Sequence, residues 1–136
     1  MNVAMRDDSS SLLPITALQT SIFPHTDQVG IEEVRIAPLC DFLTNDMIEQ
    51  PSLLKIDVQG YELDVLGGSE TCLDRFDVVY VEASFMELYQ GQPLASDVID
   101  ALNEKGFRLA AIHNLCHAQD GRAVQADFLF ERRLES

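Results

Sequence analysis

Two short, almost continuous apolar runs, separated by one helix-length segment, constrain the fold of this chain more than any other feature. Residues 53–58 read Leu-Leu-Lys-Ile-Asp-Val and end before Gly60, and residues 76–82 read Phe-Asp-Val-Val-Tyr-Val-Glu. Runs of this length that are rich in branched residues are typical of strands buried on both faces of a parallel sheet. The helical pattern at 61–66 between them predicts a strand–helix–strand unit, and therefore an α/β fold.

The second half of the chain continues this alternation and then departs from it. A helix is predicted between Ser96, its N-cap, and Gly106, its stop. Strands follow at 107–112 and 124–130, and the link between them is too short to cross over the sheet, so this pair should be antiparallel. The order strand–helix–strand–helix–strand–strand predicts a parallel sheet with helices on both faces and one antiparallel strand at the end.

The first 50 residues are the least regular part of the sequence. We expect loops there, with one short strand at Val34–Ile36 and a brief helix at residues 39–45. Residues 1–136 are therefore interpreted as one domain, in which residues 51–132 form the α/β core.

The charge and the distribution of apolar residues exclude some partners. Nine basic and 23 acidic residues give a net charge of −14, which repels phosphate backbones, so no nucleic-acid partner is expected. No apolar run approaches the roughly 20 residues needed to cross a bilayer, so no membrane partner is expected. The N-terminus has two early acids and no apolar core, unlike a secretory signal, which predicts a cytoplasmic location.

The cysteines and histidines do not indicate a disulfide framework or a metal site. The three cysteines, Cys40, Cys72 and Cys116, form an odd set with no paired spacing. Cys116 lies near His113 and His117, but two histidines and one thiol without a fourth ligand make a poor zinc site. We therefore predict no bound metal.

One continuous segment has a family likeness. Residues 54–68, Leu-Lys-Ile-Asp-Val-Gln-Gly-Tyr-Glu-Leu-Asp-Val-Leu-Gly-Gly, resemble the hallmark segment of the FkbM-type methyltransferases. Further similar segments follow in the family's order at 79–85, 87–94, 106–109, 120–122 and 125–130, and the serine run at 9–11 is also similar. The resemblance covers most of residues 9–131. It implies a partial Rossmann-like sheet of the S-adenosylmethionine-dependent methyltransferase type, and O-methylation of a sugar or a small metabolite.

The resemblance also indicates where a site should form. It places Asp57 and Glu82 at the carboxyl ends of two central strands, where open α/β sheets bind their ligands. A carboxylate there can act as a general base toward a hydroxyl group, or hold that group in line for transfer. Asp57 and Glu82 are therefore the candidate catalytic residues. The candidate substrate-binding residues are Gln59, Tyr61, Glu62, Phe85, Tyr89 and His113.

Structural roles stay open for the same residues. Asp57 can cap the helix that follows it, and Glu82 can form an ion pair with a basic side chain such as Arg108. Both candidate tyrosines can be packing residues, and His113 can simply end a strand.

The chain departs from the family in its glycines. None of its seven glycines lies in a glycine-rich turn after an N-terminal strand, the feature that lets the backbone of this fold approach its cofactor. We therefore expect the donor-binding half to be missing, and a lone chain to bind S-adenosylmethionine poorly or not at all. The 53–58 strand then loses its usual neighbour, and an unpaired apolar edge promotes association. Either the Val34–Ile36 segment folds over this edge or two chains pair there, and we predict a homo-oligomer, most simply a two-fold dimer formed through that edge.

Three functions are compatible with these features. The first is the C-terminal half of an O-methyltransferase, incomplete as a lone chain. The second is a non-catalytic, homo-oligomeric binding or assembly module derived from such an enzyme. The third is a carboxylate-based or metal-assisted hydrolase that uses Asp57, Glu82 and His113, although no nucleophile motif supports it.

Overall fold

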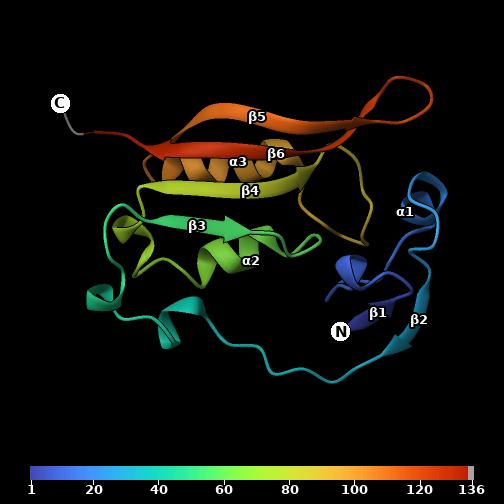
Figure 1. Cartoon of the computed structure of the whole chain (residues 1–136), viewed down its shortest axis with the longest axis horizontal. Helices are drawn as coiled ribbons and strands as arrows, with labels where there is room; N and C mark the ends of the chain where they lie inside the picture. Colours follow the sequence, from blue (N-terminus) through green and yellow to red (C-terminus); the bar gives the residue numbers. More distant parts are fainter. Residues whose placement is uncertain (135–136) are drawn as a thin grey trace.

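The computed structural model describes residues 1–134 as a mixed α/β protein with two sheets of different size (Figure 1). The small sheet pairs β1 (Asn2–Ala4) with β2 (Gln28–Ile31), and α1 (Ala17–Ile22) lies between these strands in the sequence. The elements of the larger unit are β3 (Leu53–Ile56), α2 (Glu62–Gly67), β4 (Val78–Ser84), α3 (Ala95–Glu104), β5 (Phe107–His117) and β6 (Ala123–Arg132). No helix in the described part of the chain is long and apolar enough to cross a membrane.

The large sheet is mixed, with the strand order β3-β4-β6-β5. β3 runs parallel to β4, so that Leu54 lies opposite Val79 and Ile56 lies opposite Val81. β6 is inserted between β4 and β5 and runs antiparallel to both. The short link before it predicted only its antiparallel pairing with β5. β3 is consequently an edge strand, and one of its sides has no strand partner within residues 1–134.

Both helices of the large unit pack on the same face of this sheet. Leu66 of α2 and Leu102 of α3 belong to one buried cluster with Val81 and Phe128 of the sheet, and Figure 1 shows α3 behind the strands. The prediction of helices on both faces is therefore wrong. The physical reason is that the two crossovers advance in one direction along the sheet with the same hand, which returns each helix to the same side.

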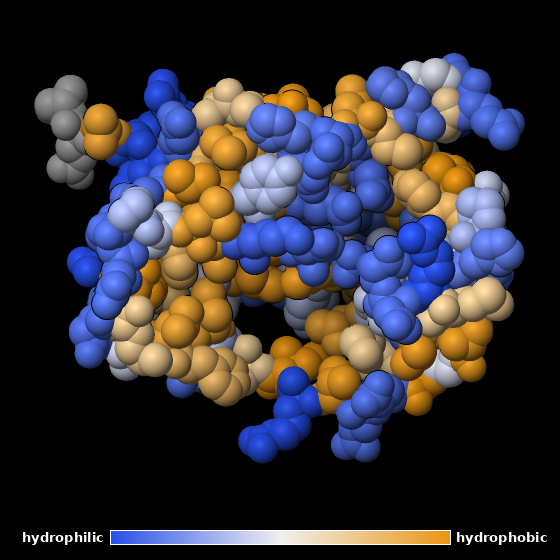
Figure 2. All heavy atoms as spheres, in the orientation of Figure 1, coloured by the Kyte–Doolittle hydropathy of each residue, from blue (hydrophilic) through white to orange (hydrophobic). Residues whose placement is uncertain are grey.

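The opposite face of the sheet stays open. Alternate residues of the strands point to it, among them Lys55 of β3, Tyr80 and Glu82 of β4 and Asp127 of β6. Figure 2 looks onto this face, where hydrophilic side chains form a band between apolar patches. The strands are thus covered on one face only, and their polar side chains are left for a site or for a partner.

The N-terminal segment is more regular than the sequence predicted, and its strands lie elsewhere. The expected strand at Val34–Ile36 is absent, because residues 32–38 cross from the small sheet to the large unit without a neighbouring strand to pair with. The expected helix at 39–45 is reduced to the 3-10 turns Leu39–Asp41 and Asn45–Met47.

This segment docks onto the loop that follows β4. The Thr16 backbone N–H and hydroxyl donate to the Leu88 carbonyl at 3.1 Å and 2.7 Å, and the Gln90 N–H donates to the Pro14 carbonyl at 2.8 Å. A second buried cluster, centred on Leu88 and Tyr89, packs against apolar side chains of residues 13–23. Residues 1–30 therefore cover one side of the carboxyl ends of β3 and β4.

The ends of the elements differ from the predicted ones in local detail. α3 begins after Leu94, whose N–H donates to the Asp97 carboxylate at 2.7 Å, so Ser96 is not the N-cap. Asp97 occupies the position where a carboxylate can satisfy a free N–H of the first turn. Gly106 follows the helix with φ +85°, in agreement with its predicted role as a stop.

Candidate functional site at the carboxyl ends of β3 and β4

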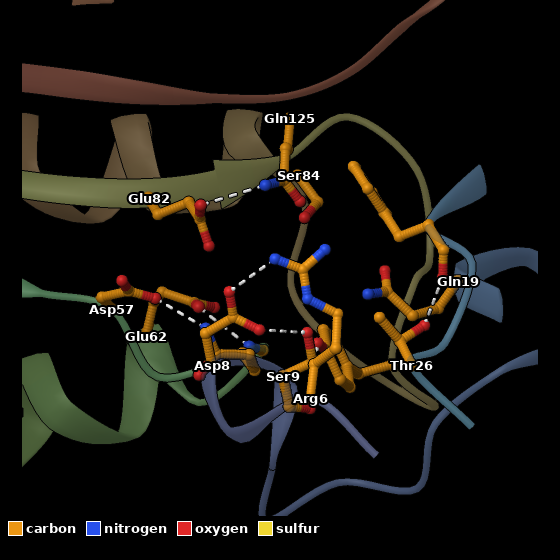
Figure 3. Close-up of a pocket in the computed structure, with 14 residues that line it drawn as sticks. Arg6, Asp8, Ser9, Gln19, Thr26, Asp57, Glu62, Glu82, Ser84 and Gln125 are labelled. Atoms are coloured by element: carbon orange, nitrogen blue, oxygen red, sulfur yellow. Dashed lines mark hydrogen bonds and ion pairs between the residues drawn. The ribbon is translucent and has the colours of Figure 1, made fainter. Parts of the chain in front are cut away.

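A pocket of ≈ 360 Å³ lies where β3 and β4 end, between the large sheet and the N-terminal segment (Figure 3). Its floor comes from the loop after β3 and from the end of β4, and its far wall comes from residues 6–26. The side chains and backbone that line it belong to Arg6, Asp8, Ser9, Gln19, Phe23, Thr26, Asp57, Gln59, Gly60, Glu62, Glu82, Ser84, Tyr89 and Gln125. Elements that are distant in the sequence thus meet at the position where open α/β sheets bind ligands.

Asp57 projects into the pocket from the residue that directly follows β3. Its carboxylate accepts a hydrogen bond from the Gln59 side-chain amide at 2.6 Å and lies 3.5 Å from the Lys55 ammonium. It does not cap the next helix, since the N-cap of α2 is Tyr61 and no side chain bonds to that helix end. Gln59 itself has φ +45°, a left-handed conformation that is uncommon for a side-chain-bearing residue and is often found at binding sites.

The turn after Asp57 depends on Gly60. Its φ of +96° favours glycine, and a Cβ at this position would lie 2.8 Å from the Gln92 Cβ and 2.9 Å from a Leu13 methyl. The loop after β4 and the N-terminal segment therefore close directly over this turn. A side chain here would push apart the walls that shape the pocket.

Glu82 reaches the same pocket from β4. Its carboxylate accepts a hydrogen bond from the Gln125 side-chain amide at 3.0 Å, whereas Arg108 pairs with Glu131 at 2.9 Å, so the expected alternative ion pair is not formed. Burial, together with the nearby charges of Asp57 and Asp127, raises the pKa of Glu82 to about 7. A carboxyl group with a pKa near neutrality can both take up and release a proton under physiological conditions.

Glu62 is the most deeply buried carboxylate of the pocket, with 3% of its surface exposed. One oxygen accepts the Gly60 N–H at 2.8 Å, and the other has no hydrogen-bond partner among the described residues. Burial raises the pKa of this carboxyl group against the opposing effect of the Gly60 hydrogen bond. Gln19 of α1, also buried, presents a side-chain oxygen that likewise lacks a partner within residues 1–134. Both atoms are buried acceptors to which no described residue donates a hydrogen bond.

Tyr89 closes the pocket from the loop after β4. Its hydroxyl donates to the Ser9 carbonyl at 3.4 Å. Burial, and then the charges of Glu82 and Asp57, raises the pKa of this hydroxyl, so it stays protonated at neutral pH. Tyr89 is thus a packing residue of the second cluster and a pocket wall at the same time.

The structure brings together five of the eight predicted site residues: Asp57, Gln59, Glu62, Glu82 and Tyr89. The other three lie outside this pocket. Tyr61 lines a neighbouring hollow beside β3, and Phe85 packs on Phe128 with ring centroids 5.7 Å apart. His113 lies on β5 with its ring 6.2 Å from that of Tyr80. A hydrolase that combines His113 with the two carboxylates is therefore not supported by this geometry.

The sequence did not point to the wall that the N-terminal segment provides. Arg6 and Asp8, which pair at 3.2 Å, and the buried Gln19 all face the pocket (Figure 3). The serine run at 9–11 was the one signal from this region, and Ser9 does line the pocket. No local pattern could show that residues 6–26 fold back over the ends of strands that begin at Leu53 and Val78.

The chemistry of this pocket favours neutral or cationic ligands. Four carboxylates line it, and its one cation, Arg6, is already paired with Asp8, so an anionic ligand would be repelled. Within residues 1–134 no group of three or more His, Cys, Asp or Glu side chains is placed to hold a metal ion. The arrangement is suited to accept hydrogen bonds from hydroxyl groups and to take up a proton at Glu82.

Comparisons with known proteins show the family of this chain. A family profile described as the methyltransferase FkbM domain matches residues 3–109. A protein of Sinorhizobium fredii (strain NBRC 101917 / NGR234), 2-O-methyltransferase NoeI, is 34% identical over 100 residues, which cover 74% of this chain and 37% of that protein. The chain therefore matches little more than a third of this curated relative. No solved structure gives a significant match.

Proposed function

This chain belongs to the FkbM methyltransferase family, and we propose that it supplies the acceptor-binding and proton-accepting part of an O-methyltransferase. The observation that carries the proposal is the convergence of Asp57 and Glu82 in one pocket at the carboxyl ends of two parallel strands. The mixed sheet, with its antiparallel strand β6 inserted before the last position, is compatible with a partial Rossmann-like methyltransferase sheet.

In this proposal Glu82 acts as the base. A hydroxyl group of the acceptor donates a hydrogen bond to the Glu82 carboxylate and gives up its proton to it as the oxygen becomes methylated. The pKa of about 7 matches this task, because a base is most effective when its pKa lies near the working pH. Asp57, held by Gln59 and Lys55, orients a second hydroxyl, and correct positioning is a large part of the catalysis of such transfers.

The proposed acceptor is a neutral, hydroxyl-rich molecule such as a sugar. The Asp57 and Glu82 side chains that line the pocket accept hydrogen bonds, and neighbouring sugar hydroxyls supply several donors at short spacing. The four carboxylates disfavour phosphorylated or acidic sugars. The 2-O-methyltransferase among the relatives supports a hydroxyl oxygen as the atom that receives the methyl group.

The described residues do not fit S-adenosylmethionine, the donor that the family implies. A donor site of this fold needs a strand, an open glycine turn and a helix N-terminus. The turn at Gly60, which links β3 to α2, is filled by Leu13 and Gln92. We therefore propose that the donor is held by a segment or chain beyond these residues, next to the free side of β3.

Two titrations of the purified chain test this proposal. In the first, isotope-labelled protein is titrated with neutral hexoses and with the matching hexuronates, followed by amide chemical shifts. Neutral sugars should shift the signals of pocket residues, and both Asp57→Asn and Glu82→Gln should weaken that response, while the exposed control Glu131→Gln should not. Equal responses to hexuronates, or no response to any neutral sugar, would refute the assigned acceptor class.

The second titration is a calorimetric one with S-adenosylmethionine. Because the described residues lack a donor site, we expect no binding at micromolar concentration. Micromolar binding to the lone chain would show that the donor site is present after all, and would overturn this part of the proposal while leaving the acceptor site untouched.

A second candidate function, a homo-oligomeric assembly module, has its own supporting observation. Leu53 of the edge strand β3 is 56% exposed, and a hollow of ≈ 880 Å³ with largely apolar walls lies along the same edge. Figure 2 shows this opening below the hydrophilic band, rimmed by apolar atoms. The unpaired backbone groups of such an edge strand can hydrogen-bond to a strand of another chain. Two copies related by a two-fold axis can pair their β3 edges in this way.

Analytical ultracentrifugation at micromolar concentration tests the module. We expect a dimer, and we expect Leu53→Lys to shift it toward the monomer because it places a charge on the edge strand. The matched control is Ile112→Lys on β5, the opposite edge strand, where the side chain is also half exposed. A monodisperse monomer of the unaltered chain would rule out this function.

A further inference from the structure

The strongest feature outside the pocket is a pair of thiols that the sequence did not connect. The Sγ atoms of Cys40 and Cys72 lie 2.6 Å apart, although 31 residues separate them in the chain. Cys40 belongs to the 3-10 turn Leu39–Asp41, and Cys72 directly precedes the 3-10 turn Leu73–Arg75. The two thiols are therefore in direct contact.

The backbone around the pair is held close by independent contacts. The Cys40 N–H donates to the Gly68 carbonyl at 3.3 Å, and the Cys72 N–H donates to the Ser69 carbonyl at 3.0 Å. A Cβ placed on Gly68 would lie 3.2 Å from the Pro38 Cα, so glycine permits the close approach of the two segments. Disulfides form only where the two backbones already lie near each other, and the Cys40–Gly68 hydrogen bond brings these two segments together.

We propose that Cys40 and Cys72 form a reversible disulfide, a covalent modification site distinct from the acceptor pocket. The oxidant is a small-molecule disulfide. The Cys40 thiolate attacks one of its sulfur atoms and releases one thiol, which leaves a mixed disulfide on Cys40. The Cys72 sulfur then attacks the Cys40 sulfur and releases the second thiol, which carries away the proton of Cys72. Two protein thiols are oxidised and one small disulfide is reduced to two thiols.

The surroundings of the two thiols give each sulfur a different role in the exchange reaction. Cys40 is half-buried and accessible, whereas Cys72 is 1% exposed. Burial acts to raise the pKa of the Cys40 thiol, but hydrogen bonds from Cys72 and Thr71 bring it below its usual value. Burial and the neighbouring Cys40 raise the pKa of Cys72 to about 12. Cys40 is therefore the attacking thiol and Cys72 the resolving one.

The bond has a consequence for the surface beside β3. Pro38 and Leu39, next to Cys40, line the hollow along the free edge of that strand. A disulfide fixes this turn to the segment after α2 and thereby fixes one wall of the hollow. This inference does not depend on methyl transfer, since neither thiol lines the acceptor pocket.

Thiol counting on the full chain tests the proposal. The protein is equilibrated with reduced or oxidised glutathione, quenched with acid, denatured and titrated for free thiols. We expect three free thiols in the reduced protein and one, Cys116, in the oxidised protein. Peptide mapping should show Cys40 joined to Cys72 within one chain, with the loss of two hydrogen atoms. Three remaining thiols, a link to Cys116, or a bond between two chains would each overturn the proposal.

Cysteine variants test which thiol attacks first and which one resolves the mixed disulfide. Cys116→Ser, the control, should still form the bond and show two thiols when reduced and none when oxidised. Cys72→Ala should accumulate glutathione on Cys40, and Cys40→Ser should leave Cys72 unmodified in the folded protein, which circular dichroism verifies. Faster modification of Cys72 than of Cys40 in these folded variants would refute the assigned order of attack.

Discussion

Removing the charge of Glu82 should stabilise the protein at neutral and alkaline pH and leave it unchanged in acid. The substitution is Glu82→Gln, which keeps the size of the side chain and an oxygen that accepts the Gln125 amide hydrogen bond. The glutamine is neutral at every pH. The difference between the two proteins therefore measures the cost of holding a carboxylate in this pocket.

The magnitude and its sign follow from the pKa of Glu82. Folding raises that pKa from 4.5 to about 7, mainly through burial. Below pH 4.5 the group is protonated in both states and contributes nothing. Between pH 4.5 and about 7 the folded state keeps a proton that the unfolded chain releases, so the free energy of unfolding falls as the pH rises. At 1.36 kcal/mol per pKa unit, the ionised Glu82 carboxylate lowers the free energy of unfolding by about 3 kcal/mol. Solvent screening of this partly exposed group reduces that value to about 2 kcal/mol.

Urea denaturation followed by far-ultraviolet circular dichroism measures this difference, since the chain has no tryptophan. Glu82→Gln should shift the unfolding midpoint upward by about 1 M urea above pH 7 and by nothing below pH 4.5. The matched control, Glu131→Gln, removes an exposed carboxylate paired with Arg108 and should change stability by less than about 1 kcal/mol. If Glu82→Gln changed the free energy of unfolding equally at every pH, or lowered it in alkali, the pocket would not disfavour the charged Glu82 carboxylate.

Three further perturbations test the packing of the fold. Gly60→Ala should lower the free energy of unfolding by about 2–4 kcal/mol, because the new Cβ meets side chains at less than 3 Å. The control Gly91→Ala is also at positive φ but faces open space, so it should lower the free energy of unfolding by about 1 kcal/mol. Urea denaturation compares the two variants. Phe128→Ala, in the centre of the sheet, should cost about 3–5 kcal/mol in the same assay, and a loss below 1 kcal/mol would contradict its place in the core. Oxidation of Cys40 and Cys72 to a disulfide should raise the free energy of unfolding by about 4 kcal/mol relative to the reduced chain, because the bond closes a loop of this length in the unfolded state. An unchanged urea unfolding midpoint would argue against an unstrained disulfide.

Much of the large unit was readable from local sequence patterns. The apolar runs at 53–58 and 76–82 became β3 and β4, and the short link near Gly121 predicted the antiparallel strand β6. Gly106 ends α3 as expected. These features depend on side-chain periodicity and turn chemistry over a few residues, which the sequence carries directly.

The expectations that failed depended on contacts between distant segments. Val34–Ile36 has the alternation of a strand, but pairing requires a neighbour, and none lies beside residues 32–38. The choice of sheet face for α2 and α3 follows from the direction in which the crossovers advance, which no single helix reveals. The fold of residues 1–30 over the pocket depends on a long-range cluster around Leu88.

The site shows the same division. The family resemblance in the sequence by itself placed Asp57 and Glu82 at the carboxyl ends of two central strands, and parallel strands bring those ends to one edge of a sheet. Only the tertiary structure decided that Glu62 is buried with a free oxygen, that Glu82 titrates near pH 7, and that Cys40 meets Cys72. Burial, electrostatic fields and distances between remote side chains are properties of the packed chain, and they arise only once the N-terminal segment and the turns around α2 have closed against the sheet.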